Sequence, residues 1–575
     1  MAQRTADQAS FRPRGRQFRL SRDRTLDLFR RPEPIPYSIV AGDPVQPFTL
    51  TLLQANSQSR FGVLTPTPVR FDLLLDPQRS DETLRLRLQD AGGVADEAEI
   101  NLLPSAVIVQ EVDIITGGTR NHVDLNLTDA VQDVVIRGNA SSYLDFDFAP
   151  LDAHPSAGPL RIDARRSQGL TAVFLGDYRP TELLVRGARS PASTTLLGLQ
   201  PVGDVTLSGL RDVDGLILQK GSTGELNLRS NRFLQQLEVQ PLGERPGEDH
   251  ALTRLHQARA IQSIRFVGSG EAAPQRFPGL ELNRGPGPAG TSGRRPLSIG
   301  YDNRGLRLGA ADSLSHADPL ILNGVRSLRL DARPVLGHRG AWSIPGIAGR
   351  QLQHLTVLNR SQGSTDLGLI THGSPPGRRP LQGRLRTLEF SRLQGSVQLM
   401  LDTTSLQRFS TVRAGDGGLA LQLQSPPVRS PRWVTSGDGD DRIGVGPTRQ
   451  TIHSGVGRDR FVVVEPNRGE INHLLQLDVD DPEPSDDAIV VPQSGVNQRT
   501  LWLDVATDLS TFQRQARAQS RSAPSAAGLY LSPAITDAGA VTWGYFNSSG
   551  LRDDLVFALQ GDHAPVLQGQ QILLG

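Results

Sequence analysis

Short apolar strands at a regular spacing constrain the fold of this chain more than any other feature. The triplets V-T-L, L-I-L, L-N-L and L-E-V begin at Val205, Leu216, Leu226 and Leu237, at intervals of 11, 10 and 11 residues. Alternation places residues i and i+2 on one face, so each triplet supplies an apolar pair to a shared interior. Strands this short are not stable alone. Their spacing therefore predicts stacked windings in which each winding buries the face of the next.

The same alternation continues through most of the chain, which bears on the choice between two all-β folds. Further apolar triplets begin at Ile264, Leu280, Leu297, Leu306, Leu320, Leu328, Leu355, Leu388 and Val397. A β-sandwich also has strands every 8–12 residues. The pattern is too long for one sandwich, and each strand supplies only two or three inward residues. We therefore expect an all-β fold, a long parallel β-solenoid, and keep the sandwich as the alternative.

Composition excludes several classes of chemistry and partner. The 575 residues contain 61 Lys and Arg, 60 Asp and Glu, and no cysteine. The balanced charge gives no reason to expect a nucleic-acid partner, and the missing cysteines exclude disulfides, thiolate metal sites and cysteine nucleophiles. No apolar run approaches the ~20 residues of a membrane-spanning helix, so no transmembrane segment is expected. The basic N-terminus has no apolar stretch after it and does not read as a cleaved secretory signal.

Changes in composition along the chain suggest five segments. Residues 1–36 carry nine arginines and are expected to form a disordered arm, or alternatively an electrostatic grip on an anionic surface. Residues 37–97 suggest a small strand-rich unit, 98–426 the β-solenoid, 427–490 a β-roll, and 491–575 a strand-rich C-terminal cap. Short helices are predicted over residues 20–31 and 248–258.

The segment from Ser436 to Val462 divides into three units of nine residues: SGDGDDRIG, VGPTRQTIH and SGVGRDRFV. The eighth position of each unit is apolar, as Ile443, Ile452 and Phe461, and Val434 holds the same place in the nine before them. Two units make one 18-residue winding, so corners 18 residues apart stack on the same side. The middle unit lies on the opposite side and lacks an aspartate, so no ion is expected there.

The first and third units carry the residues that a cation-binding corner needs. Glycine at the second and fourth positions permits backbone angles that a side chain forbids. Asp441 and Asp459, at the sixth positions, are 18 residues apart. A hard cation such as calcium takes six to eight oxygen ligands. Two stacked corners offer these as carboxylates and carbonyls, so the expected metal site consists of Gly437, Gly439, Asp441, Gly455, Gly457 and Asp459.

These two units resemble the calcium-binding nonapeptide of the repeats-in-toxin (RTX) family, G-G-x-G-x-D-x-apolar-x, with Ser436 and Ser454 in place of the first glycine. The resemblance implies a β-roll that binds calcium. The stretch that follows from Phe461 and the segment from Asp553 resemble the closing and terminal segments of such proteins, which implies export by a one-step, type I route. The upstream repeats resemble those of bacterial surface-layer and RTX surface proteins.

Other candidate motifs give weaker predictions of function. The glycines of GPGPAG at 285–290 fit a dinucleotide-binding spacing, but two prolines occupy the turn and no helix follows. Asp124, with Asp145 and Asp147, is the candidate carboxylate face of a polysaccharide lyase or hydrolase on a β-helix; the alternative is a solvated strand face. His372 is a possible catalytic group or a plain loop residue. Asp480–Asp481 and Asp486–Asp487 either bind further calcium or solubilise a turn.

Together these patterns predict a secreted, calcium-binding β-solenoid with a structural, adhesive or cell-surface-coat role. The expected partners are calcium ions together with cell-surface polysaccharide or further copies of the chain. No catalytic residue is assigned and no enzyme activity is expected; an extracellular polysaccharide lyase or hydrolase is the alternative.

Overall fold

The computed structural model describes β-strands, the turns beside them and a helix in the C-terminal region. It describes residues 17–20, 24–27, 37–41, 48–53, 69–75, 83–91, 98–102, 109–128, 130–149, 159–175, 182–188, 193–199, 212–219, 224–228, 234–240, 252–267, 275–284, 296–301, 305–308, 320–332, 341–344, 346–359, 365–371, 384–402, 404, 406–424, 429–446, 448–464, 473–478, 487–491, 498–522, 527–536, 539–547, 554–560, 565–568 and 571–574. Contacts divide the chain into two compact units, unit 1 (Met1–Ile264) and unit 2 (Arg265–Gly575), which are described separately.

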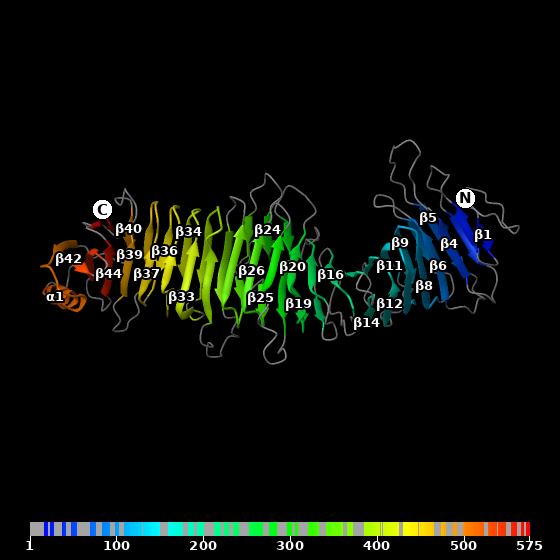
Figure 1. Cartoon of the computed structure of the whole chain (residues 1–575), viewed down its shortest axis with the longest axis horizontal. Coiled ribbons are helices and arrows are strands. Elements are labelled where there is room, and N and C mark those ends of the chain that lie inside the picture. Colours follow the sequence, from blue (N-terminus) through cyan, green and yellow to red (C-terminus); the bar gives the residue numbers. More distant parts are fainter. Residues whose placement is uncertain are drawn as a thin grey trace, which may run out of the picture. The chain divides into compact units, whose positions relative to one another are not determined.

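Unit 1 consists of parallel strands that alternate along the chain between two sheets, so that two strands belong to each winding (Figure 1). The first sheet contains β1 (Gln17–Leu20), β3 (Tyr37–Ala41), β5 (Val69–Leu75), β7 (Ala98–Leu102), β9 (Arg120–Thr128), β11 (Ser141–Ala149), β13 (Thr171–Leu175), β15 (Thr195–Leu199), β16 (Gly215–Leu218) and β18 (Gln236–Val239). The second contains β2 (Arg24–Asp27), β4 (Phe48–Leu53), β6 (Thr83–Gln89), β8 (Glu111–Gly117), β10 (Asp133–Gly138), β12 (Leu160–Ser167) and β14 (Leu183–Arg186). A further pair is β17 (Gly224–Asn227) with β19 (Leu252–His256).

Unit 2 also consists of parallel strands in two sheets and ends in antiparallel strands; in its first windings the second sheet holds two short strands per winding. Strand β20 (Ser263–Phe266) contains the point of division. Its first sheet contains β23 (Leu297–Tyr301), β26 (Ser327–Ala332), β29 (His354–Asn359), β31 (Leu385–Phe390), β33 (Leu406–Ala414), β35 (Trp433–Thr435), β37 (Gln450–His453), β39 (His473–Asp478), β44 (Asp554–Gln560), β43 (Gly539–Asn547), β42 (Ala527–Thr536) and β41 (Gln498–Trp502). Its second contains β21 (Gln275–Phe277), β22 (Gly279–Asn283), β24 (Gly305–Leu308), β25 (Leu320–Asn323), β27 (Ala341–Ser343), β28 (Gly346–Ala348), β30 (Thr365–Thr371), β32 (Val397–Leu401), β34 (Leu419–Leu423), β36 (Arg442–Val445), β38 (Arg460–Val463), β40 (Ala488–Val490), β46 (Gln571–Leu573) and β45 (Val566–Gln568).

The parallel, in-register pairing of successive windings confirms the predicted β-solenoid in both units. In unit 1, Leu216 on β16 pairs with Leu237 on β18, so the predicted spacing of 10 or 11 residues is half a winding. Both side chains are 1% exposed and belong to an apolar column that runs from winding to winding. The triplet at Val205 lies outside the described residues.

Four predictions about the N-terminal half are wrong. Strands β1 and β2 lie within the expected disordered arm and pair with β3 and β4. Strands β3 to β6 continue into the same parallel sheets as β7 and β8, so residues 37–97 form no separate unit. The predicted helix at 248–258 is the strand β19, because Thr253 and Leu255 point inward, and Leu255 pairs with Leu226. The β2 strand likewise replaces the helix predicted over residues 20–31.

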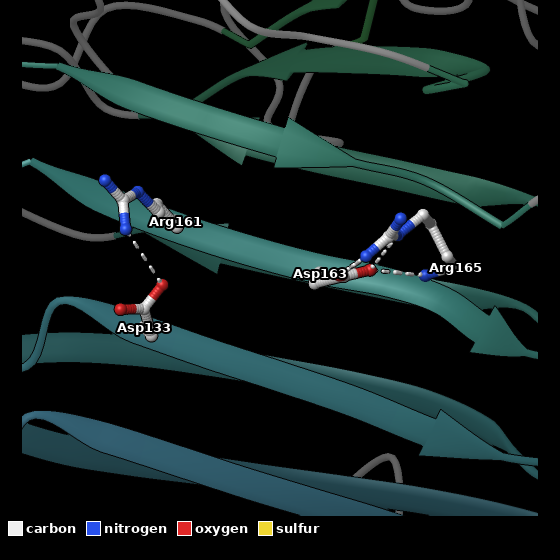
Figure 2. A network of polar contacts seen from close by, with 4 residues as sticks. All are labelled: Asp133, Arg161, Asp163 and Arg165. Carbon is white, nitrogen blue, oxygen red and sulfur yellow. Dashed lines mark hydrogen bonds and ion pairs between the residues drawn. The ribbon is translucent and has the colours of Figure 1, made fainter.

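The outer face of the second sheet in unit 1 carries arginine–aspartate pairs. Figure 2 shows Asp163 receiving hydrogen bonds from Arg165, and Arg161 lying 3.9 Å from Asp133 on the neighbouring winding. The Arg165 side chain lowers the pKa of Asp163. Exposed pairs of this kind contribute little to stability, typically about 0–1 kcal/mol. The coil is therefore stabilised mainly by the apolar side chains buried in its interior.

The C-terminal part of unit 2 joins antiparallel strands to helix α1 (Leu509–Arg521). Asp508 caps this helix by accepting a hydrogen bond from the Thr511 N–H. Phe512 packs on Trp543, with 5.9 Å between ring centroids. Within the described part of the chain, no helix combines the length and apolarity needed to cross a lipid bilayer.

We expect Phe461→Ala to destabilise unit 2 by about 3–5 kcal/mol, because the substitution leaves a cavity in an apolar column. Phe461 is fully buried and pairs with Ile443 on the preceding winding. Val456→Ala, at a side chain that is 41% exposed, is the control and should change stability by less than about 0.5 kcal/mol. Urea unfolding followed by circular dichroism measures both. Equal midpoints for the two variants would contradict the inward placement of Phe461.

Candidate functional site: a column of buried aspartates

The winding predicted from the nonapeptide spacing is present in unit 2. Strand β36 pairs with β38 and β35 pairs with β37, each residue facing the residue 18 positions later. The apolar eighth-position residues all point into the coil and are fully buried; they are Val434, Ile443, Ile452 and Phe461. The nine-residue frame therefore predicts both the strands and their inward faces.

Asp441 and Asp459 lie one above the other on successive windings, immediately before β36 and β38. The Asp441 N–H donates to Oδ1 of Asp459 at 3.0 Å, and the Leu419 N–H donates to Oδ1 of Asp441 at 2.7 Å. Their side chains are 2% and 0% exposed. Each carboxylate thus satisfies a backbone donor of the winding before it, and both acids are held inside the coil.

The glycines beside these aspartates allow the corners to stack. Gly455 has a φ of +79° and Gly457 a φ of +144°, in the region that favours glycine. A Cβ at Gly455 would lie 2.5 Å from the Gly437 carbonyl oxygen, and one at Gly457 would lie 2.8 Å from that of Gly439. The four predicted glycines therefore bring the two corners into backbone contact and turn carbonyl oxygens toward the next winding.

The opposite corner of the same winding is held by neutral groups. The Ser430 N–H donates to Oγ1 of Thr448 at 3.0 Å, and the two hydroxyls lie 2.7 Å apart. These residues are also 18 positions apart. Stacking of corners at this spacing therefore needs no charge, and the expectation that no ion binds on this side stays a prediction.

Burial raises the pKa of Asp441 to about 7, and the charges of Asp459 and Asp440 act in the same direction. The Ser436 hydroxyl and the Leu419 N–H oppose this rise. Oδ2 of Asp441 is buried and has no hydrogen-bond partner among the described residues; the Ser436 hydroxyl donates to the Ser454 carbonyl, at 3.2 Å. The hydroxyl of Ser454 is buried without a partner in the same part of the structure. The corner thus holds a carboxylate oxygen and a hydroxyl that are buried without a hydrogen-bond partner among the described residues.

This donor set suits a hard divalent cation. Calcium prefers carboxylate, hydroxyl and carbonyl oxygens, and it compensates the charge of adjacent buried carboxylates. Asp441 and Asp459 would supply the carboxylates, and the corner carbonyls and Ser454 further oxygens. No three acidic or histidine side chains converge on one point within the described ranges, so backbone oxygens would complete the shell.

Two features of this site are not predicted by the nine-residue spacing. Asp487, just before β40, continues the column, because the Asp459 N–H donates to its Oδ1 at 2.8 Å. The winding between Asp459 and Asp487 contains 28 residues, so the nine-residue frame does not reach it. Upstream, the corner at residues 415–418 stacks beneath Gly437, because a Cβ added at Gly437 would lie 2.7 Å from the Gly415 carbonyl carbon. The sequence GDGG at residues 415–418 is the feature from which this corner could have been predicted.

The remaining candidate residues fall into two groups. Asp124 on β9 pairs with Asp145 on β11, and Asp147 pairs with Asn126, so the structure brings the predicted carboxylate face together in unit 1. An acidic pair in register is also what a solvated strand face presents, so the enzyme alternative stays a hypothesis. Other candidates lie outside the described residues: His372, residues 285–290, Asp480, Asp481 and Asp486.

Comparison with known proteins gives no relative from which a function for this site could be inferred. No protein-family model, curated protein or solved structure matches this chain. The RTX resemblance accordingly depends on the residues of 436–462.

We expect Gly455→Ala to destabilise unit 2 more than Gly539→Ala. Both glycines have positive φ, but no atom lies within 4 Å of a Cβ at Gly539, whereas the Gly437 carbonyl oxygen blocks one at Gly455. Backbone conformation alone costs about 1–2 kcal/mol. The additional loss of stability in Gly455→Ala over Gly539→Ala therefore measures the contact between the two corners. Thermal unfolding of both variants checks this. Equal losses would mean that the corners do not touch.

In buffer free of divalent ions, we expect stability to fall as the pH rises from about 4 to 7. The pKa of Asp441 in the folded state, about 7, exceeds the ordinary aspartate value of 3.8, so the folded chain binds this proton more tightly than the unfolded chain. The stabilisation that this proton contributes is therefore complete below the pKa of the unfolded chain. Roughly 4 kcal/mol of it is lost as the pH rises to the pKa of the folded chain. Asp441→Asn should flatten this slope in denaturant titrations at each pH. Identical slopes in variant and wild type would contradict the assignment.

Proposed function

We propose that the protein is a secreted, calcium-binding β-solenoid with a structural, adhesive or cell-surface-coat role. The observation that carries the proposal is the stacking of Asp441 on Asp459, both buried and one winding apart. Two adjacent buried carboxylates repel, and removing them from water is unfavourable unless charge is compensated. A calcium ion between the corners would turn this repulsion into shared coordination.

The scaffold role is supported by the way the coil is built. The described windings bury aliphatic columns inside and carry paired charges outside, as in the sheet of Figure 2. Such a coil offers long outer faces to cell-surface polysaccharide or to further copies of the chain. A protein stabilised by calcium gains this support outside the cell, where calcium is abundant, and remains looser before export. The polysaccharide lyase or hydrolase is the runner-up, supported by the pairing of Asp124 with Asp145.

We expect calcium to raise the melting temperature of the wild-type protein and not that of Asp459→Asn. The amide oxygen still accepts the Asp441 N–H, so the fold is kept while one ligand charge is removed. At a calcium concentration ~100 times the dissociation constant, the wild-type gain corresponds to about 2.7 kcal/mol.

Asp438→Asn is the matched control, because Asp438 is an exposed acid of the same corner. This variant should keep the full calcium response. Differential scanning calorimetry with calcium, and after removal of calcium with chelator, measures all three proteins. A wild-type protein whose melting temperature and strand signal do not respond to calcium would refute the proposal.

A further inference from the structure

Helix α1, at the C-terminal end of the coil, has one apolar face and one arginine stripe (Figure 1). Phe512 and Ala516 are fully buried against β42 and β43. Arg514, Arg517 and Arg521 follow one another at intervals of three and four residues, so they lie in one stripe along the helix. Arg514 and Arg521 are exposed and Arg517 is half-buried. The stripe formed by these three arginines therefore lies beside the buried face and is open to solvent.

The arginine stripe is unfavourable for the helix itself. The helix sequence LSTFQRQARAQSR contains neither Asp nor Glu. Arg517 lies three residues after Arg514 and four before Arg521, and like charges at these spacings destabilise a helix. Only Arg521, in the last turn, gains from the partial negative charge of the helix C-terminus. Folding therefore does not explain why three positive charges are kept on one side of α1.

Outward arginines on the strands of the coil are arranged differently. Several lie beside an acid of the same or the neighbouring strand: Arg165 beside Asp163, Arg254 beside Glu225, and Arg413 beside Glu389. By contrast, neither Arg514 nor Arg521 forms an ion pair with any described residue. Guanidinium groups bind carboxylate and phosphate through paired N–H donors. Helix α1 thus presents positive charge that an external anion can compensate.

The other exposed residues of α1 favour a polysaccharide over a lipid bilayer. A helix that lies in a membrane interface inserts large apolar side chains there. The exposed positions of α1 are instead Ser510, Arg514, Ala518, Gln519 and Arg521. The two exposed arginines are two helical turns apart, roughly 10 Å along the axis. A linear polymer with repeated anionic groups can therefore contact both of them without any apolar insertion.

We propose that α1 binds an acidic polysaccharide, with the arginine stripe contacting its carboxylate or phosphate groups. This inference rests on the proposed function, because it names the chemistry of the cell-surface polymer that the protein would meet. Arg514 and Arg521 are the direct contacts, and Arg517 between them adds to the positive field. The contact involves no calcium and uses a different element from the aspartate column.

The test uses two triple variants of the full-length chain that lose the same charge. The first combines Arg514→Gln, Arg517→Gln and Arg521→Gln. The matched control removes arginines that lie beside acids, and it combines Arg165→Gln, Arg254→Gln and Arg413→Gln. Binding to hyaluronate, which carries carboxylates, and to dextran phosphate is measured by isothermal titration calorimetry, with neutral dextran as the reference.

We expect the control to bind the acidic polymers as the wild type does, and the α1 variant to bind roughly tenfold more weakly or less, because hydrogen bonds to charged groups are lost. Raising sodium chloride from about 50 to 200 mM should weaken wild-type binding by about tenfold, because each arginine contact releases a counterion. Neutral dextran should bind to none of the proteins.

The outcomes separate this inference from the proposed function. Equal affinities of the α1 variant and the control would overturn the inference, as would wild-type binding to phosphatidylglycerol vesicles or duplex DNA that is tighter than binding to both polymers. The calcium dependence of the wild-type melting temperature tests the proposed function separately, and binding that depends on the arginine stripe can survive its failure. Should the triple α1 variant fail to fold, Arg514→Gln alone decides, because a partial loss of affinity supports the inference and an unchanged affinity contradicts it.

Discussion

Parallel pairing in register between successive windings is the constraint on which the rest of this structure depends. Each strand is too short to bury its own apolar face, so the face of the next winding must cover it. Register then decides which side chains meet. The pairing that sets Ile443 under Phe461 also sets Asp441 under Asp459. The geometry that builds the apolar interior thus stacks like charges wherever a corner residue is acidic.

The two corners of the 18-residue winding show what this constraint permits. At one corner, Ser430 and Thr448 satisfy each other with hydroxyl and backbone hydrogen bonds. At the other, the carboxyl groups of Asp441 and Asp459 satisfy backbone donors and are themselves buried. Both corners belong to the same coil, so the acidic one is not required for winding. Buried charge is unfavourable unless it is compensated, and the acidic corner is therefore where a cation would change stability most.

Sequence periodicity predicted the fold and the centre of the site because both follow from a constant frame. Nine-residue spacing correctly placed Val434 and Ile452 in the interior and Asp441 over Asp459. Prediction failed where local composition was used instead. The arginine-rich start was expected to be disordered and residues 248–258 to be helical, yet both contain strands that pair with neighbouring windings. Tertiary pairing overrides local propensity in such segments, and a single sequence does not show which partner a strand will find.

Asp487, which the sequence marked only as a further calcium ligand or a solubilising turn residue, shows why the nine-residue frame has limits. Each of the three successive hydrogen bonds in the column links a backbone N–H to an aspartate 22, 18 or 28 residues later. The winding length varies, while the place of the acid relative to the following strand is constant. Asp487 precedes β40 just as Asp459 precedes β38. A column is therefore defined by strand register and not by sequence spacing. An acid kept in register where the spacing is lost, such as Asp487, therefore belongs to the column, although the nonapeptide spacing does not reach it.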